Sequence, residues 1–173
     1  IKKETKNLKK CKIISQKNKG SANATNVGIK AAKMKYIKFL DADDVILSDS
    51  TDSLIEIFEN NPGCNLAYGL QRKVQNIDNV NLDEKINKEN LTYIKNPAKL
   101  AMRNSMFNPS QFMVKTDLCQ MTNGCDERVK FSQEYSLTLK LSMFGGFIRL
   151  NHALAILPFK APGQISEKKN QQI

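Results

Sequence analysis

The chain has 173 residues, of which 40% are hydrophobic and 25% charged, and its formal net charge is +10 at pH 7. This length and composition suit one globular domain with a sizeable core, and they exclude an intrinsically disordered chain. They also exclude a membrane-spanning helix, because no apolar run approaches the roughly 18 residues that such a helix needs.

The first segment is strongly basic. Residues 1–19 hold eight lysines and a single acid, Glu4, which gives a balance of +7. Such a segment can contact an anionic membrane surface or nucleic acid. It lacks the Arg and aromatic residues that specific nucleic-acid binding recruits. We therefore expect a solvated surface, no nucleic-acid partner and at most peripheral contact with a membrane.

The first 70 residues alternate between strand and helix patterns. Helix signals include the N-cap candidates before each periodic run and the Asn-Pro-Gly stop after the second one. The expected elements are a strand at 12–15, a helix capped by Ser21 that continues through Ala32 or Lys33, a strand at 36–40, a helix capped by Ser48 or Ser50, and a strand at 66–70. This order predicts an α/β fold with a mixed, mainly parallel central sheet flanked by helices.

The second half is less regular. Residues 75–96 are polar and poorly periodic, which predicts a long loop with at most one short element. Further elements are predicted as a helix at 97–103, a strand at 111–114, an Asn123-Gly124 turn, a helix at 133–144, and strands at 147–150 and 153–157.

Scattered cysteines indicate a reducing environment. Cys11, Cys64, Cys119 and Cys125 form no Cys-x-x-Cys pair, and His152 is the only histidine. A structural zinc site is therefore not expected. Isolated reduced cysteines are typical of the cytoplasm, where we expect the protein, with at most peripheral contact at the inner face of the membrane.

Three carboxylates follow the strand at 36–40, in the run Asp41-Ala42-Asp43-Asp44. Open α/β sheets bind ligands at the carboxyl ends of their strands. Asp41 and Asp43 are two residues apart, so their side chains can converge on one cation. Hard oxygen ligands without nearby Cys or His suit Mg²⁺ or Mn²⁺. The alternative is an acidic turn without a ligand.

Three separated motifs then occur in order. They are Asn18-Lys19-Gly20 with Asn26-Val27-Gly28, the run Leu40-Asp41-Ala42-Asp43-Asp44, and Asn123-Gly124-Cys125-Asp126-Glu127 followed by Gln133-Glu134-Tyr135. In this order and spacing they resemble the family 2 glycosyltransferases, which have the GT-A fold. The resemblance extends over residues 12–166.

The resemblance implies inverting transfer of a sugar from a nucleotide-diphosphate sugar donor to a hydroxyl of a glycan or lipid-linked acceptor, in cell-surface polysaccharide synthesis. It implies a divalent metal, Mn²⁺ or Mg²⁺, that neutralises the leaving group. The residues it assigns are Asp43 and Asp41 for the metal; Asn18, Gly20, Asn26, Asp41 and Asp44 for the donor; Glu134 as general base; and Asn108, Ser110, Asp126 and Glu127 for the acceptor region.

The sequence departs from the family pattern in several places. Gln133 replaces the first acid of the pair that opens the late helix, and Thr25 replaces the usual Arg. Residues 159–166 lack the late His of the family. The family's first two strands have no counterpart, so we interpret residues 1–166 as one N-terminally truncated domain with a polar tail at 167–173.

Each assignment keeps an alternative. A catalytically inactive fragment that retains the fold, or a basic nucleic-acid-binding module, would also fit parts of the pattern. Glu134 could be an acid that only stabilises the first turn of a helix. Asn26 could simply hydrogen-bond a neighbouring loop.

Overall fold

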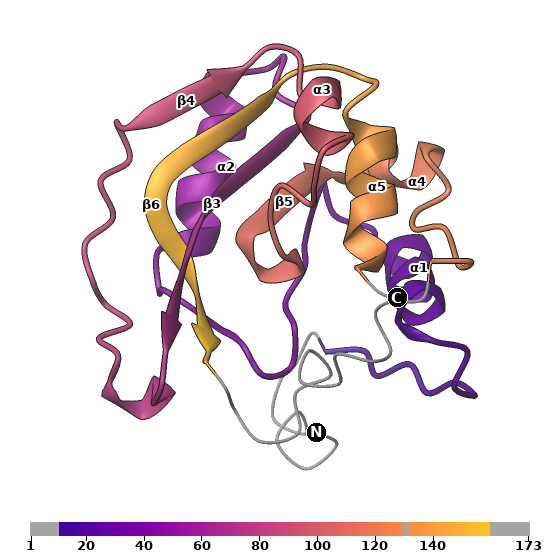
Figure 1. The fold of residues 1–173 in the computed structure, drawn as a ribbon, viewed down its shortest axis with the longest axis horizontal. Coiled ribbons are helices and arrows are strands. Elements are labelled where there is room, and N and C mark those ends of the chain that lie inside the picture. Colours follow the sequence, from indigo (N-terminus) through magenta and orange to yellow (C-terminus); the bar gives the residue numbers. More distant parts are fainter. Residues whose placement is uncertain (1–10, 130–131, 160–173) are drawn as a thin grey trace.

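The structure is a computed structural model that describes residues 11–129 and 132–159. In it a sheet is flanked by helices (Figure 1). The helices are α1 Ser21–Ala31, α2 Ser50–Asn60, α3 Ala98–Ala101, α4 Thr116–Met121 and α5 Gln133–Leu141, with 3₁₀ turns η2 Ile77–Asn79 and η3 Pro109–Gln111. The strands are β1 Tyr36–Lys38, β2 Val45–Ile46, β3 Leu66–Val74, β4 Leu91–Ile94, β5 Phe112–Lys115 and β6 Phe147–Pro158.

The sheet is mixed, as predicted, but its pairs are not mainly parallel. Its strand order is β1-β5-β3-β6-β2, with β4 also paired to β6. Among the described residues only β3 and β6 pair in parallel, and the other four pairs are antiparallel. β1 and β3 do run in the same direction, as the strand–helix–strand pattern predicts. However, β5 comes from the second half of the chain, lies between them and runs opposite to both.

Two hydrophobic cores lie on the two faces of the sheet. Along β3, Leu66 and Tyr68 belong to one core and Ala67 to the other, which is the alternation expected of a strand. The first core packs against α1, α4 and α5, which gather on one side in Figure 1. The second packs against α2. The sheet is therefore the middle layer of three.

The strand predicted at 12–15 is wrong. Residues 11–20 have no regular structure, and Ile13 and Ile14 are 43% and 44% exposed. A β-branched run forms a strand only where a neighbouring strand supplies hydrogen-bond partners. β1 ends the sheet and, within the described ranges, pairs only with β5.

Several elements of the second half differ from the prediction. The segment 75–96, expected to be a loop with one short element at most, holds both η2 and β4, and α4 follows β5 directly. The two strands predicted at 147–150 and 153–157 are one strand, β6, whose pairing with β3 changes register beside Leu70. An irregularity of this kind, such as a β-bulge, interrupts the alternation of side chains between the two faces of the sheet without ending the strand. The polar tail predicted at 167–173 lies outside the described residues.

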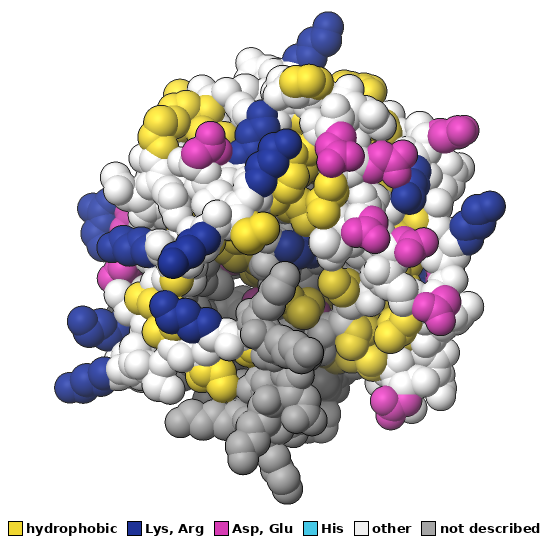
Figure 2. All heavy atoms as spheres, turned by 180° about the vertical axis from the view of Figure 1, so that it is seen from behind, with side chains coloured by type: hydrophobic (Ala, Val, Ile, Leu, Met, Phe, Trp, Pro, Cys, Tyr) yellow, Lys and Arg dark blue, Asp and Glu magenta, His cyan; other side chains and the backbone are white. Residues whose placement is uncertain are grey.

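Charged side chains are unevenly distributed over the surface. Figure 2 shows Lys and Arg mainly on one side of the rear face and Asp and Glu mainly on the other. Lys33 and Lys35, after α1, are exposed, as are Asp52 and Glu56 on α2. Positive charge thus extends beyond the basic segment at 1–19. No helix in the part of the chain that is described is long and apolar enough to cross a membrane.

Candidate functional site

The acidic turn, defined as residues 41–44, follows β1 as predicted. The backbone N–H of Asp44 donates to the carbonyl of Asp41 at 3.2 Å and closes the turn. Asp41 is exposed as a residue, but partial burial of its carboxylate raises its pKa, and the charges of Asp44 and Asp43 raise that pKa further. These carboxylates therefore repel one another at the end of one strand, an arrangement that a bound cation would stabilise.

Ser110 supports the acidic turn from inside the fold. It is fully buried, and its Oγ accepts a hydrogen bond from the backbone N–H of Asp41 at 2.9 Å. Burial raises the pKa of Asp44, and a hydrogen bond with Ser110 opposes this effect. The family resemblance assigns Ser110 to the acceptor region, and in the structure its buried hydroxyl contacts the backbone of the acidic turn.

Lys38, at the end of β1, is a residue that the sequence analysis missed. Its Nζ donates to the carbonyl of Ser110 and, at 3.3 Å, to that of Phe39. Burial lowers the pKa of Lys38 to about 8, and the charge of Asp44 opposes the change. The sequence signal for this role is a lysine within an otherwise apolar strand. Because Lys is rarely buried without partners, a lysine at such a position indicates specific contacts inside the fold.

A pocket of about 90 Å³ lies between the acidic turn and the start of α5. Its lining residues are Thr25, Phe39, Leu40, Asp41, Pro109, Phe112, Cys125, Gln133, Glu134 and Leu137. Burial raises the pKa of Glu134, and the charge of Asp41 adds to the shift. Two carboxylates, Asp41 and Glu134, therefore share one pocket. Of the residues in the acidic turn, Asp41 lines this pocket with Glu134, whereas Asp43 does not.

The predicted donor loop precedes α1. Asn18 Oδ1 accepts a hydrogen bond from the backbone N–H of Gly20 at 3.0 Å, and both residues are exposed. Gly20 has a φ of 92°, a left-handed conformation that favours glycine. This loop is open to solvent at the start of α1, and neither residue lines the pocket.

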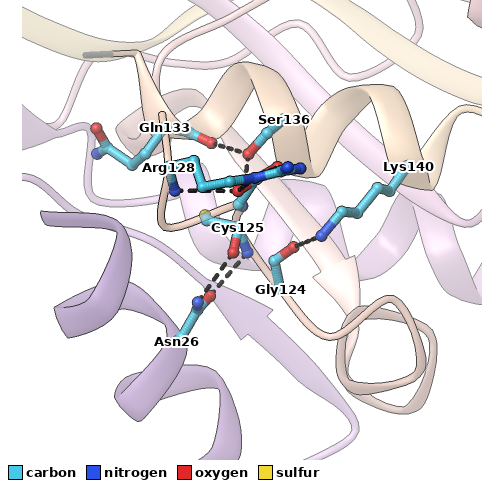
Figure 3. A network of polar contacts seen from close by, with 8 residues as sticks. Asn26, Gly124, Cys125, Arg128, Gln133, Ser136 and Lys140 are labelled. Atoms are coloured by element: carbon cyan, nitrogen blue, oxygen red, sulfur yellow. Dashed lines mark hydrogen bonds and ion pairs between the residues drawn. The ribbon is translucent and has the colours of Figure 1, made fainter. Parts of the chain in front are cut away.

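Asn26 does not point into the pocket. It is 7% exposed, and its amide faces the backbone of Cys125 (Figure 3). Nδ2 donates to the Cys125 carbonyl at 3.0 Å and to Glu127 Oε1 at 3.1 Å, while Oδ1 accepts from the Cys125 N–H at 2.7 Å. The structure thus favours the alternative that Asn26 holds a loop over a direct contact with the donor.

The remaining residues of the predicted acceptor region are engaged within the protein. Asp126 pairs with Arg128 at 2.6 Å, and the hydrogen bonds from Arg128 hold the Asp126 pKa well below its usual range. Hydrogen bonds from Asn26 and then Asn23 lower the pKa of Glu127. Asn108 donates to Gln71 Oε1 at 2.8 Å. The neighbour of Asn108, Pro109, lines the pocket instead.

The acidic turn by itself is not a complete metal site. Within residues 11–129 and 132–159, no group of three or more His, Cys, Asp or Glu side chains is arranged to hold a metal ion. A cation held there would need further oxygen ligands from water or from a substrate phosphate, which is how Mg²⁺ is usually bound.

Comparison with known proteins identifies relatives over most of the chain. The family model described as "Glycosyl transferase family 2" matches residues 1–120. An uncharacterized glycosyltransferase of Haemophilus influenzae is 22% identical over 157 residues, which cover 85% of this chain and 50% of the relative. Chondroitin synthase of Escherichia coli is 26% identical over 150 residues, covering 84% of this chain and 20% of the relative.

A shorter and more similar match is poly-beta-1,6-N-acetyl-D-glucosamine synthase of Staphylococcus epidermidis. It is 46% identical over 55 residues, which cover 32% of this chain and 13% of the relative. The chain therefore spans half the length of these relatives or less.

Solved structures of S. aureus TarS show the same fold. The complex of TarS residues 1–349 with UDP has a TM-score of 0.61 and 14% identity, over 82% of this chain and 40% of that one. A longer TarS structure has a TM-score of 0.63 and 15% identity, over 84% of this chain and 25% of that one. At these identities the likeness concerns the fold alone.

Proposed function

The chain belongs to glycosyl transferase family 2 and is a glycosyltransferase domain, and we propose that it transfers a sugar from a nucleotide-diphosphate donor to a glycan hydroxyl with inversion. The observation that carries the proposal is the shared pocket of Asp41 and Glu134. It brings an acid from the carboxyl end of β1 together with an acid from the first turn of α5. A sugar transfer needs both a group on the donor side and a proton acceptor on the acceptor side.

Glu134 is the proposed general base. Its carboxylate takes the proton of the acceptor hydroxyl, whose oxygen forms a bond to the anomeric carbon of the donor. The bond from that carbon to the phosphate oxygen breaks, and the nucleoside diphosphate leaves with the electron pair. Attack from the side opposite the leaving group inverts the configuration. Burial raises the pKa of Glu134, which brings it nearer to the pH at which a base works best.

Asp41 and Asp43 are proposed to hold Mn²⁺ or Mg²⁺. Their fit to such an ion rests on the hard oxygen donors of the acidic turn and on the mutual repulsion that raises the pKa of Asp41. When bound, the ion would neutralise charge on the leaving diphosphate. Asp44 is oriented by Ser110 and lies beside this pair.

Other parts of the proposal rest on the comparisons and on charge. The TarS complex with UDP supports a nucleotide donor, which we place near Asn18 and Gly20 at the start of α1. The named polysaccharide synthases among the relatives support a glycan or lipid-linked acceptor. The isolated free cysteines support a cytoplasmic location, and the exposed lysines support peripheral contact at the inner face of an anionic membrane.

Isothermal titration of the protein with UDP, with and without Mn²⁺, tests the donor half of the proposal. We expect Asp43→Asn to weaken Mn²⁺-dependent UDP binding at least tenfold, because one of two anionic ligands is lost. Asp78→Asn, an exposed acid in η2, is the matched control and should bind like the parent. A UDP affinity that is the same with and without Mn²⁺, and the same in the parent and in Asp43→Asn, would contradict the proposed site.

A further inference from the structure

We propose that Asn26 is a positioning residue that sets where Glu134 stands relative to Asp41. The inference rests on the proposed function, because it concerns the base of that reaction. Asn26 is not among the residues that line the pocket. It acts on Glu134 through the loop segment, defined as residues 124–127, which packs between α1 and α5.

The contact between Asn26 and the loop segment is two-way. The side-chain amide donates to the carbonyl of Cys125 and accepts from its N–H, so it satisfies both backbone groups of one residue. A further bond from Nδ2 reaches Glu127. An Asn side chain has two donor hydrogens and one acceptor oxygen. Here the amide of Asn26 both donates and accepts, and it is buried, where an unpaired backbone group of Cys125 would cost stability.

Gly124 shows that the loop segment is shaped to receive this amide. Its φ is 69°, a conformation that favours glycine. A Cβ on Gly124 would lie 2.2 Å from Oδ1 of Asn26 and 3.3 Å from Cδ1 of Ile29. A larger residue at position 124 would therefore push Asn26 and α1 away.

The same loop segment is tied directly to α5. The N–H of Asp126 donates to Ser136 Oγ at 2.9 Å, and Lys140 Nζ donates to the carbonyl of Gly124 at 2.7 Å (Figure 3). Ser136 and Lys140 stand on successive turns of α5. The link between loop segment and helix is thus made by side chains and does not depend on the chain path through residues 130–131.

A second contact joins α1 to α5 at the pocket. Ser21 Oγ donates to Oε1 of Gln133 at 3.1 Å, one residue before Glu134. Cys125, held by Asn26, lines the same pocket as Glu134 and Asp41. Removing the Asn26 amide would therefore loosen one wall of the pocket. A misplacement of about 1 Å at a reacting group can slow a reaction on the order of a hundredfold.

The thiols of the protein provide a test that needs no turnover. Cys125, Cys64 and Cys119 are buried, and Cys11 is exposed. Labelling with a thiol reagent, read per cysteine by mass spectrometry, should be at least tenfold faster at Cys125 in Asn26→Ala than in the parent. The rates at Cys64 and Cys119 should not change. Equal acceleration at all three buried thiols, or none at Cys125, overturns the proposal.

Turnover of a nucleotide sugar separates positioning from folding. Asn26→Ala should lower kcat on the order of a hundredfold and leave the donor KM unchanged. Gly28→Ala adds stability in the same helix, because Gly28 is exposed in α1 with no atom within 4 Å of an added Cβ. The double variant should regain part of the lost thermal stability but none of the lost kcat.

The outcomes remain distinct from those of the proposed function. If the double variant regains kcat, Asn26 is only structural and the inference fails. If the parent protein turns over no nucleotide sugar at all, the proposed function fails. The thiol pattern then decides by itself whether Asn26 holds the loop segment.

Discussion

Lys38→Met should change how stability depends on pH. Lys38 lies at the end of β1 with its ammonium group donating to two backbone carbonyls, and burial lowers its pKa from 10.5 to about 8. Between these two values the unfolded chain binds more protons at this position than the folded protein does. The free energy of unfolding of the parent should therefore rise with pH over this window, which Met, having no charge, cannot reproduce.

The magnitude follows from the size of the window. A difference of one pKa unit corresponds to about 1.4 kcal/mol, so the shift to about 8 amounts to about 3 kcal/mol. Below pH 8 the folded protein bears this full penalty, and above pH 10.5 the penalty is gone. Relative to Lys38→Met, the parent should thus gain about 3 kcal/mol between pH 7.5 and 10.5.

Urea unfolding at a series of pH values measures this difference. Comparing the parent with Lys38→Met cancels the titration of groups that both proteins share. Lys33→Met is the control, because Lys33 is exposed and its variant should keep the pH dependence of the parent. If the gap between the parent and Lys38→Met stays constant across the window, or changes in the opposite direction, burial does not lower the pKa of Lys38 and the reasoning is refuted.

Two further predictions concern the residues around the pocket. Glu134→Gln should lower kcat by about a hundredfold or more with UDP binding unchanged. Because burial raises the Glu134 pKa, the parent should also lose unfolding free energy relative to this variant as pH rises through that pKa. Ser110→Ala leaves the Asp41 N–H without its partner, so urea unfolding should show a loss of about 1–3 kcal/mol and titration a weaker Mn²⁺–UDP complex. Ser105→Ala, exposed in the adjoining loop, should change neither.

Local patterns predicted the elements that depend on their own residues. The helical spacing of apolar residues located α1, α2 and α5, and the apolar run before Asp41 located β1. The position of Glu134 at the start of α5 follows from the same reading. Each of these signals lies within one segment, so no long-range contact was needed to find it.

Strand pairing could not be predicted in the same way. The insertion of β5 between β1 and β3 joins residues more than 40 positions apart. Nothing in the sequence of Phe112–Lys115 indicates which neighbours it will have. Conversely, the residues at 12–15 have a good strand composition but no regular structure, because composition does not supply a partner strand.

The roles of Asn26 and Ser110 illustrate a second limit. The family resemblance assigns both to ligand binding, and both side chains have polar groups that could contact a substrate. In the structure both are instead buried and hydrogen-bonded within the protein, since Asn26 is 7% exposed and Ser110 is fully buried. Burial depends on the packing of α1 and η3 against the sheet, which no local pattern records.

These two buried residues support two parts of the lining of one pocket, and the repulsion between Asp41 and Glu134 gives a reason for having both. The charge of Asp41 raises the pKa of Glu134, so the two carboxylates repel each other across the pocket. If flexible side chains and loops alone held these two carboxylates, their repulsion would move them apart. Ser110 fixes the backbone at Asp41, and Asn26 fixes the loop segment that is tied to the helix of Glu134. Holding two like charges at a working separation requires rigid supports on each side.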